Sequence, residues 1–172
     1  QNGVATLIAD TANIGPDYIP GHAHADTLSF ELELAGRPTL VNTGISTYAN
    51  SPRRWHERST AAHNALTIGA RNSSDTWASF RVGQRARVQD RTLNETADGP
   101  PRIATHDGYR RFAPGHLHRR SWMLSNTRLE VRDEIAGDAT RTQAHFHILD
   151  RSRLQWSSPD ADLRVDQGFH HP

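Results

Sequence analysis

An unbroken alternation of apolar and polar residues, LSFELEL, runs from Leu28 to Leu34. A half-buried β-strand has this period of two, because its successive side chains point to opposite faces of the sheet. The segment Ala35–Pro38 then indicates a turn, and Thr39–Val41 the returning arm of a hairpin. This pattern predicts antiparallel β-structure.

Further strands are predicted along the chain, with turn signals at about the 8–12-residue spacing of an all-β sandwich. They cover Ala65–Ile68, Arg85–Leu93, Arg102–His106, Leu117–Leu124, Arg128–Ile135, Gln143–Leu149 and Arg153–Trp156. The segment Ser51–Ala62 is predicted to be a loop or a short helix. We therefore expect one all-β domain over residues 1–172, an antiparallel multi-stranded layered β-sandwich with few or no helices.

The composition restricts the classes of protein and of site. The 172 residues include no cysteine, so disulfides and thiolate metal ligands are excluded and a metal ion would need His, Asp, Glu or Asn. The formal net charge is +1, which does not favour a nucleic-acid partner. No apolar run approaches the roughly 18 residues of a membrane span. All basic side chains are arginines, whose rigid forks suit carboxylates and sulfates.

The stretch GHAHAD, residues Gly21–Asp26, carries two histidines one residue apart, at His22 and His24. If the following strand continued backwards in an extended conformation, both histidines and the aspartate would lie on the same face as Phe30. Polar groups on that inward face need partners, because burying one unpaired costs about 1–3 kcal/mol. This favours a site at the mouth of the sheet. The alternative is an exposed lead-in segment, with Pro20 and Gly21 breaking the extension.

Two other polar residues lie next to predicted strands and can complete such a site. His63 stands just before one strand, and Asn42 ends the return arm of the first hairpin. Zinc prefers nitrogen, sulfur and carboxylate oxygen, so the neutral Asn42 weakens the metal interpretation. The other histidine pairs are interpreted as hydrogen-bonded filler or surface residues: His116 with His118, and His145 with His147.

Four short motifs follow one another along the chain: PGHAHAD from Pro20, LSF from Leu28, VNTG from Val41 and RSTAAHN from Arg58. The later WASFRV from Trp77 and GYRR from Gly108 extend the series. Together these residues resemble the C-terminal β domain of heparinase II/III-type polysaccharide lyases. The resemblance implies a parent protein in which an α/α toroid precedes the β-sheets and the substrate cleft lies between them. The chain is then expected to be a fragment that lacks the toroid.

The same resemblance implies a β-elimination on a polysaccharide that contains uronic acid, such as a glycosaminoglycan. His22 and Tyr48 are the implied catalytic residues, and Tyr48 is the only tyrosine between Asn42 and His63. Arg58 and Asn64, from the fourth motif, are the expected substrate contacts. The implied partners are an acidic polysaccharide and the toroid of the same protein.

A structural zinc ion is also implied, with His24, Asn42 and His63 as its ligands. The family has an aspartate where this chain has Asn42, 18 residues after His24. Loss of that negative charge leaves two hypotheses open: a weak or absent metal, or a triad held by hydrogen bonds. If a metal binds, we expect it to fix the loop that carries Tyr48.

Other functions remain open from the sequence. One is a non-catalytic carbohydrate-binding or structural β module, in which Arg53, Arg54 and Arg58 grip carboxylates. A cupin is less favoured, because Glu31 lies seven residues after His24 and on the opposite face of the strand. The parent is expected to be a bacterial protein of the periplasm or the exterior, and the sequence does not identify its polysaccharide.

Overall fold

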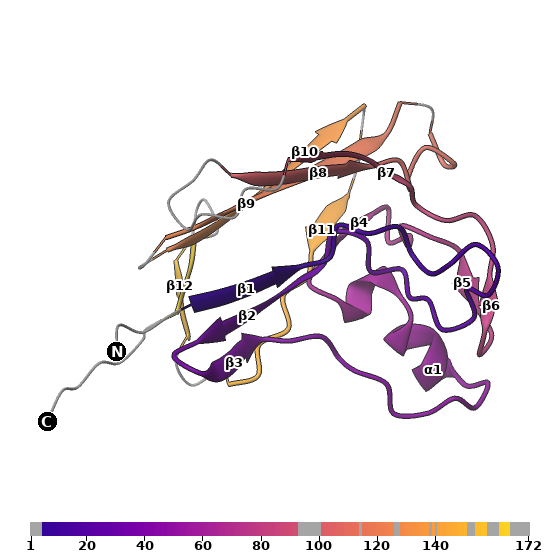
Figure 1. The fold of residues 1–172 in the computed structure, drawn as a ribbon, viewed down its shortest axis with the longest axis horizontal. Helices are drawn as coiled ribbons and strands as arrows, with labels where there is room; N and C mark the ends of the chain where they lie inside the picture. The colour runs from indigo at the N-terminus through magenta and orange to yellow at the C-terminus, as the bar shows by residue number, and fades with distance from the viewer. Residues whose placement is uncertain are drawn as a thin grey trace, which may run out of the picture.

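The computed structural model describes residues 5–92, 101–113, 115–125, 128–137, 139 and 141–150, together with the backbone of 154–157 and 162–165. Nearly all regular structure within these residues is antiparallel strand, with one α-helix (Figure 1). The predicted all-β, antiparallel layered fold is confirmed. In this part of the chain, no helix is long and apolar enough to cross a membrane.

Two antiparallel sheets form the main layers and lie one above the other in Figure 1. The three-stranded sheet has the order β1-β2-β3 and contains β1 Ala5–Ala9, β2 Phe30–Leu34 and β3 Arg37–Leu40. The four-stranded sheet has the order β10-β9-β8-β7 and contains β7 Val88–Thr92, β8 Arg102–His106, β9 Leu117–Leu124 and β10 Leu129–Ala136.

Short two-stranded pairs and one helical segment complete the described fold. The pairs are β4 Leu66–Ile68 with β11 Thr142–Ala144, β5 Thr76–Trp77 with β6 Arg81–Val82, and β12 Leu154–Ser157 with β13 Asp162–Val165. The helical segment contains α1, Pro52–Glu57, and the 3-10 helix η1, Thr60–Ala62. Helix α1 begins here because the Ser51 side chain caps the backbone N–H of Arg54 and a proline occupies the first turn.

Both predicted hairpins are present, as β2–β3 and β9–β10, although the first begins at Phe30 rather than at Leu28. The other predicted strands correspond to β4, β7, β8, β11 and β12, with β7 and β11 shorter than expected. Leu93 and Arg153, at the ends of two predicted strands, lie outside the described residues. The alternation does not reveal β1, because Ile8 lies on its exposed face, nor the very short β5, β6 and β13.

The apolar core lies between the two main sheets. Phe30, Leu32 and Leu40 face it from the three-stranded sheet, while Ala104 and Trp122 face it from the four-stranded sheet. Within β2, Phe30 and Leu32 are buried and the residue between them is exposed, as the alternation predicts. Burying each large apolar side chain stabilises the fold by roughly 1.5–3 kcal/mol, so this layer contact is the main apolar contribution.

A buried polar network continues the inward face of β9, where His118, Arg120 and Trp122 alternate with less buried residues. The Arg120 guanidinium forms two hydrogen bonds with Asp133 on β10, at 2.7 and 2.9 Å. His118 Nε2 also lies 2.7 Å from Asp133 Oδ1, and His118 Nδ1 lies 2.9 Å from His106 Nε2. His118 is thus a buried, hydrogen-bonded residue, which agrees with its interpretation as filler.

Acidification should destabilise this network. Burial lowers the pKa of His106 well below its ordinary value, and burial likewise lowers the pKa of His118 although Asp133 acts in the opposite direction. Below about pH 6.5 these histidines bind protons in the unfolded chain but not in the native state. The free energy of unfolding therefore falls by up to about 1.4 kcal/mol per pH unit for each group. We expect the melting temperature to fall between pH 7 and pH 5.

Thermal melts at pH 7, 6 and 5 check this. His106→Gln should make the dependence shallower, whereas His56→Gln, at an exposed position on α1, should leave it unchanged. A melting temperature that stays constant or rises on acidification would contradict the expectation.

Candidate functional site

The GHAHAD stretch is not an extension of β2. Leu28 has a positive φ of 63°, and the backbone N–H of Ser29 donates to the carbonyl of Asp26 at 2.8 Å, so the chain turns before the strand begins. The prediction that the histidines share the inward face is therefore wrong. His22 is exposed, whereas His24 is buried.

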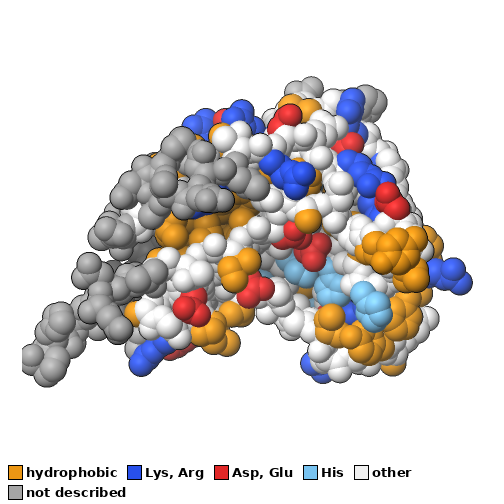
Figure 2. All heavy atoms as spheres, in the orientation of Figure 1, with side chains coloured by type: hydrophobic (Ala, Val, Ile, Leu, Met, Phe, Trp, Pro, Cys, Tyr) orange, Lys and Arg blue, Asp and Glu red, His pale blue; other side chains and the backbone are white. Residues whose placement is uncertain are grey.

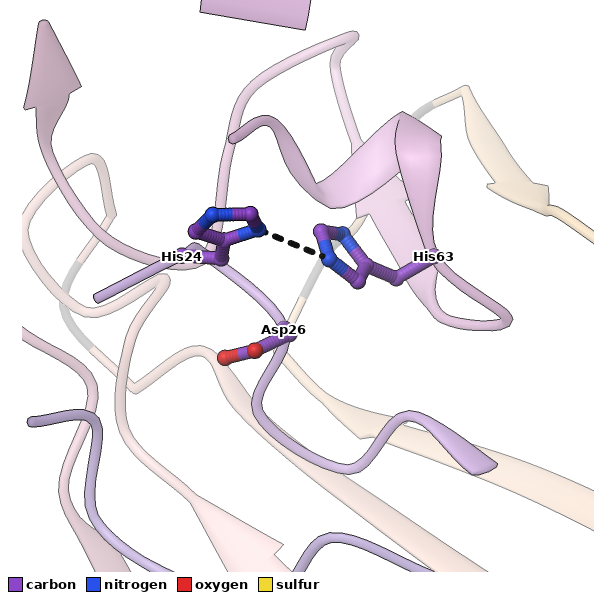
Figure 3. Close-up of side chains that lie close together, drawn as sticks. All are labelled: His24, Asp26 and His63. Carbon is purple, nitrogen blue, oxygen red and sulfur yellow. Dashed lines mark hydrogen bonds between the residues drawn. The ribbon is translucent and has the colours of Figure 1, made fainter. Parts of the chain in front are cut away.

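His24 and His63 form a buried pair, drawn in Figure 3. His24 Nδ1 lies 3.2 Å from His63 Nε2, and His63 Nδ1 lies 2.8 Å from the carbonyl oxygen of Ser59. The two segments are joined by a hydrogen bond from Thr60 Oγ1 to the carbonyl of Ala25, at 2.7 Å. Since a carbonyl only accepts, His63 carries its proton on Nδ1, and His24 donates to the free Nε2.

Asp26 adds a carboxylate to this pair. One ligand atom from each of His24, Asp26 and His63 lies within 4.8 Å of the others (Figure 3). Burial, together with the nearby Asp10, raises the pKa of Asp26 to about 7, while burial is the main cause that lowers the pKa of His24 to about 4. Among the described residues no cation forms an ion pair with Asp26.

These residues fit a bound metal ion. Two ligand nitrogens on one tetrahedral zinc ion, with bonds of about 2.0–2.1 Å, stand about 3.3 Å apart, close to the observed separation of 3.2 Å. A divalent cation would also supply the positive charge that the Asp26 carboxylate lacks. The third predicted ligand is engaged elsewhere: Asn42 Nδ2 donates to Glu31 at 2.6 Å, and its Oδ1 accepts from the backbone N–H of Gly44 at 2.7 Å.

The two predicted catalytic residues lie next to each other on the surface. The rings of His22 and Tyr48 meet edge to face, 5.6 Å between centroids, and Phe80 contacts both rings at 5.5 and 5.8 Å. The Arg54 guanidinium lies 5.1 Å from the centroid of the Tyr48 ring. Figure 2 shows histidine side chains gathered in a hollow of this face, between acidic and hydrophobic side chains.

Phe80 is absent from the predicted site, although it belongs to the WASFRV motif. The motif was the only signal, because no pattern of spacing links residue 80 to residues 22 and 48. The tight β5–β6 turn places Phe80 at the site, since Trp77 pairs with Arg81 across it.

The loop that carries Tyr48 is tied to helix α1. Glu57, which is buried, accepts hydrogen bonds from both the backbone N–H and the hydroxyl of Ser46, and from Arg53 Nε at 3.1 Å. These contacts lower the pKa of Glu57 to about 2, with the Ser46 hydroxyl as the main cause, so the carboxylate is charged at neutral pH. Glu57 therefore fixes the position of the Tyr48 loop.

The structure does not place Arg58 and Asn64 at the surface, where substrate contact requires them. Arg58 is 1% exposed and donates to the carbonyls of Ala23, Trp77 and Ala78. Asn64 is fully buried, donates to the carbonyls of Phe30 and Val41, and accepts from the backbone N–H of His147. Both side chains hold backbone segments of the site together.

The layered antiparallel sheets and the cluster of histidine, tyrosine and arginine side chains define a β-sandwich domain with a polar site on its loops. The family described as "Heparinase II/III-like, C-terminal" matches residues 1–168. The chain therefore belongs to this family, as its motifs predict. A comparison with curated proteins found no match.

Solved structures share the fold. A heparinase III structure has a TM-score of 0.60 and 18% sequence identity, over 89% of this chain and 22% of its own chain. A mutant of the heparan sulfate lyase HepC from Pedobacter heparinus has a TM-score of 0.61 and 20% identity, with the same coverage. The present chain thus spans less than a quarter of the length of these proteins.

The position of Asn64 leads to a stability prediction. Asn64→Ala removes three hydrogen bonds to buried or partly buried backbone groups, and a buried group costs about 1–3 kcal/mol when left unsatisfied. We expect a loss of at least about 3 kcal/mol in unfolding free energy, measured by urea denaturation. Asn50→Ala, at an exposed position, is the matched control. A variant that keeps native stability would instead favour the original substrate-contact role.

Proposed function

We propose that this chain is the β domain of a polysaccharide lyase that cleaves uronic-acid-containing polysaccharide by β-elimination. The observation that carries the proposal is the contact between the exposed rings of His22 and Tyr48, the two residues for which the family resemblance implies catalysis. Membership of the heparinase II/III-like family supports the reaction class.

In this reaction the C5 proton leaves a uronic acid unit, the C4–O glycosidic bond breaks and a C4–C5 double bond forms. The leaving oxygen takes up a proton. His22 and Tyr48 together supply an imidazole and a phenol for these two proton transfers, and each positioned acid or base contributes about 10²–10⁴-fold to the rate. Phe80 contacts both rings and keeps them in place.

We further propose zinc as the metal, held by His24, Asp26 and His63. These residues would hold the ion as a cross-link between two loop segments, and it would not be a reactive centre because His24 and His63 are buried. Asp26 takes the role that the family gives to the position of Asn42. If His24 bound the ion through Nδ1, its ring proton would lie on Nε2. Nε2 could then no longer accept a hydrogen bond from Arg54 Nη1, which lies 3.4 Å from it.

The lyase proposal is tested on the full-length parent. Incubation with uronic-acid polysaccharides should give ultraviolet absorbance from the unsaturated product, with kcat reduced about 10²–10⁴-fold in His22→Ala and in Tyr48→Phe. His56→Ala and Tyr18→Phe are the matched controls, at exposed positions that make no ring contact with His22 or Tyr48 among the described residues. A parent that binds such polymers without cleaving any of them would support the carbohydrate-binding alternative instead.

The metal proposal is tested by calorimetric titration of the chelator-treated protein with zinc alone. We expect Asp26→Asn to weaken zinc binding at least tenfold and Asn42→Ala to leave it nearly unchanged, because Asp26 carries the charge. Chelation of the loaded protein should also lower its melting temperature. The opposite order of the two variants would restore Asn42 as the ligand, and no zinc binding by the unmodified protein would exclude the site.

A further inference from the structure

Arg54 differs from Arg58, Arg111 and Arg120, three arginines of the described residues that bond to several backbone carbonyls. Arg120 has an aspartate partner and two carbonyl acceptors, Arg111 has Asp75 and three carbonyls, and Arg58 has three carbonyls. Arg54 is fully buried, yet it makes only long contacts, 3.3 Å to the Ser79 carbonyl and 3.4 Å to His24 Nε2. Its charge is therefore the least compensated of the four.

One guanidinium nitrogen of Arg54 has no partner at all. Nη2 is buried and forms no hydrogen bond within the described structure, and no acidic side chain there forms an ion pair with Arg54. Glu57, on the same helix, directs its oxygens to Ser46 and Arg53 instead. An unpaired buried charge strongly destabilises a fold, so its presence indicates a partner that the domain alone does not provide.

The free nitrogen belongs to the site already described. The Arg54 guanidinium lies 5.1 Å from the Tyr48 ring centroid and 6.0 Å from that of Phe80, and His22 contacts both of these rings. Tyr48 and Phe80 are each about half exposed, at 52% and 47%. The guanidinium therefore lies next to two rings that are open to solvent.

We propose that Arg54 binds an anionic group of the saccharide, a carboxylate or a sulfate, through Nη2. A guanidinium presents a planar fork of donors that matches the oxygens of either group. The identity of the ligand as a saccharide rests on the proposed function, whereas the need for an anion rests on the unpaired charge. A uronate carboxylate held here lies beside His22 and Tyr48, where positive charge stabilises the negative charge that develops as the C5 proton leaves.

The first test compares two buried arginines by thermal melting. Arg54→Met removes an unpaired charge, so the melting temperature should stay level or rise by about 2–4 °C. Arg120→Met, the matched control, leaves the Asp133 carboxylate without its arginine partner. It should lower the melting temperature by more than about 2–4 °C. A drop for Arg54→Met equal to that for Arg120→Met would overturn the proposal, because it would show that Arg54 is satisfied within the fold.

The second test measures binding by calorimetry in the full-length parent, with His22→Ala in the background to prevent turnover. Arg54→Met should weaken binding of a heparan sulfate hexasaccharide at least tenfold. Two modified hexasaccharides, one desulfated and one carboxyl-reduced, distinguish the two anionic groups. If Arg54→Met no longer changes the affinity for one of them, that hexasaccharide lacks the group that Arg54 binds. Equal affinities with and without Arg54, or no binding of hexasaccharide, free glucuronate or sulfate by the protein, would overturn the proposal.

These outcomes are distinguishable from failure of the lyase proposal. A parent that cleaves no uronic-acid polymer, but still binds the hexasaccharide through Arg54, retains the anion site and loses only the reaction. A parent that cleaves polymer with the same kcat/KM in Arg54→Met retains the reaction and loses the anion site.

Discussion

The Arg120 guanidinium is the interaction on which the rest of the domain depends. It pairs with Asp133 across the β9–β10 hairpin, and its remaining nitrogen donates to the carbonyls of Leu28 and Asn64 at 2.9 and 2.7 Å. Leu28 lies two residues after Asp26, and Asn64 directly follows His63. One buried ion pair therefore anchors both loop segments of the candidate metal site to the four-stranded sheet. Removing one partner of such a pair typically costs 3–5 kcal/mol.

Around this anchor, the loops of the site are held by side chains that bond to backbone rather than to one another. Asn64 joins β2, the end of the first hairpin and the segment of His147, while Arg58 joins Ala23 to the β5–β6 turn. Irregular loops leave their backbone groups without regular partners, so buried polar side chains are needed to satisfy them. Arg58 and Asn64 of the RSTAAHN motif are thus explained by the fold before any substrate is considered.

The compensation of buried charge separates Arg54 from the other buried arginines. Within the described residues, Arg58 and Arg120 bond to carbonyls or to an aspartate and Arg111 forms an ion pair with Asp75, whereas Arg54 combines full burial with an unpartnered nitrogen and no ion pair. The carboxylates of the described residues show the same contrast, because Asp133 forms an ion pair with Arg120 and Asp26 forms none. The cation and the carboxylate that lack an ion pair both lie close to His24.

The sequence by itself determined the β class, both hairpins and the family, since period-two alternation and ordered motifs are local properties that survive folding. It also predicted His22, His24, His63 and Tyr48 as site residues. The structure places them in two pairs, His22 with Tyr48 and His24 with His63. Tertiary structure alone decided the roles of the rest. The positive φ at Leu28 breaks the extended conformation before β2. The alternation of residues within the strand therefore could not predict that His24 is buried and His22 exposed. The groups near Asp26, Arg54 and Asn64 include His63, the Ser79 carbonyl and the His147 amide, which lie 37, 25 and 83 residues away along the chain. Only the packing of loop against sheet brings such distant groups together.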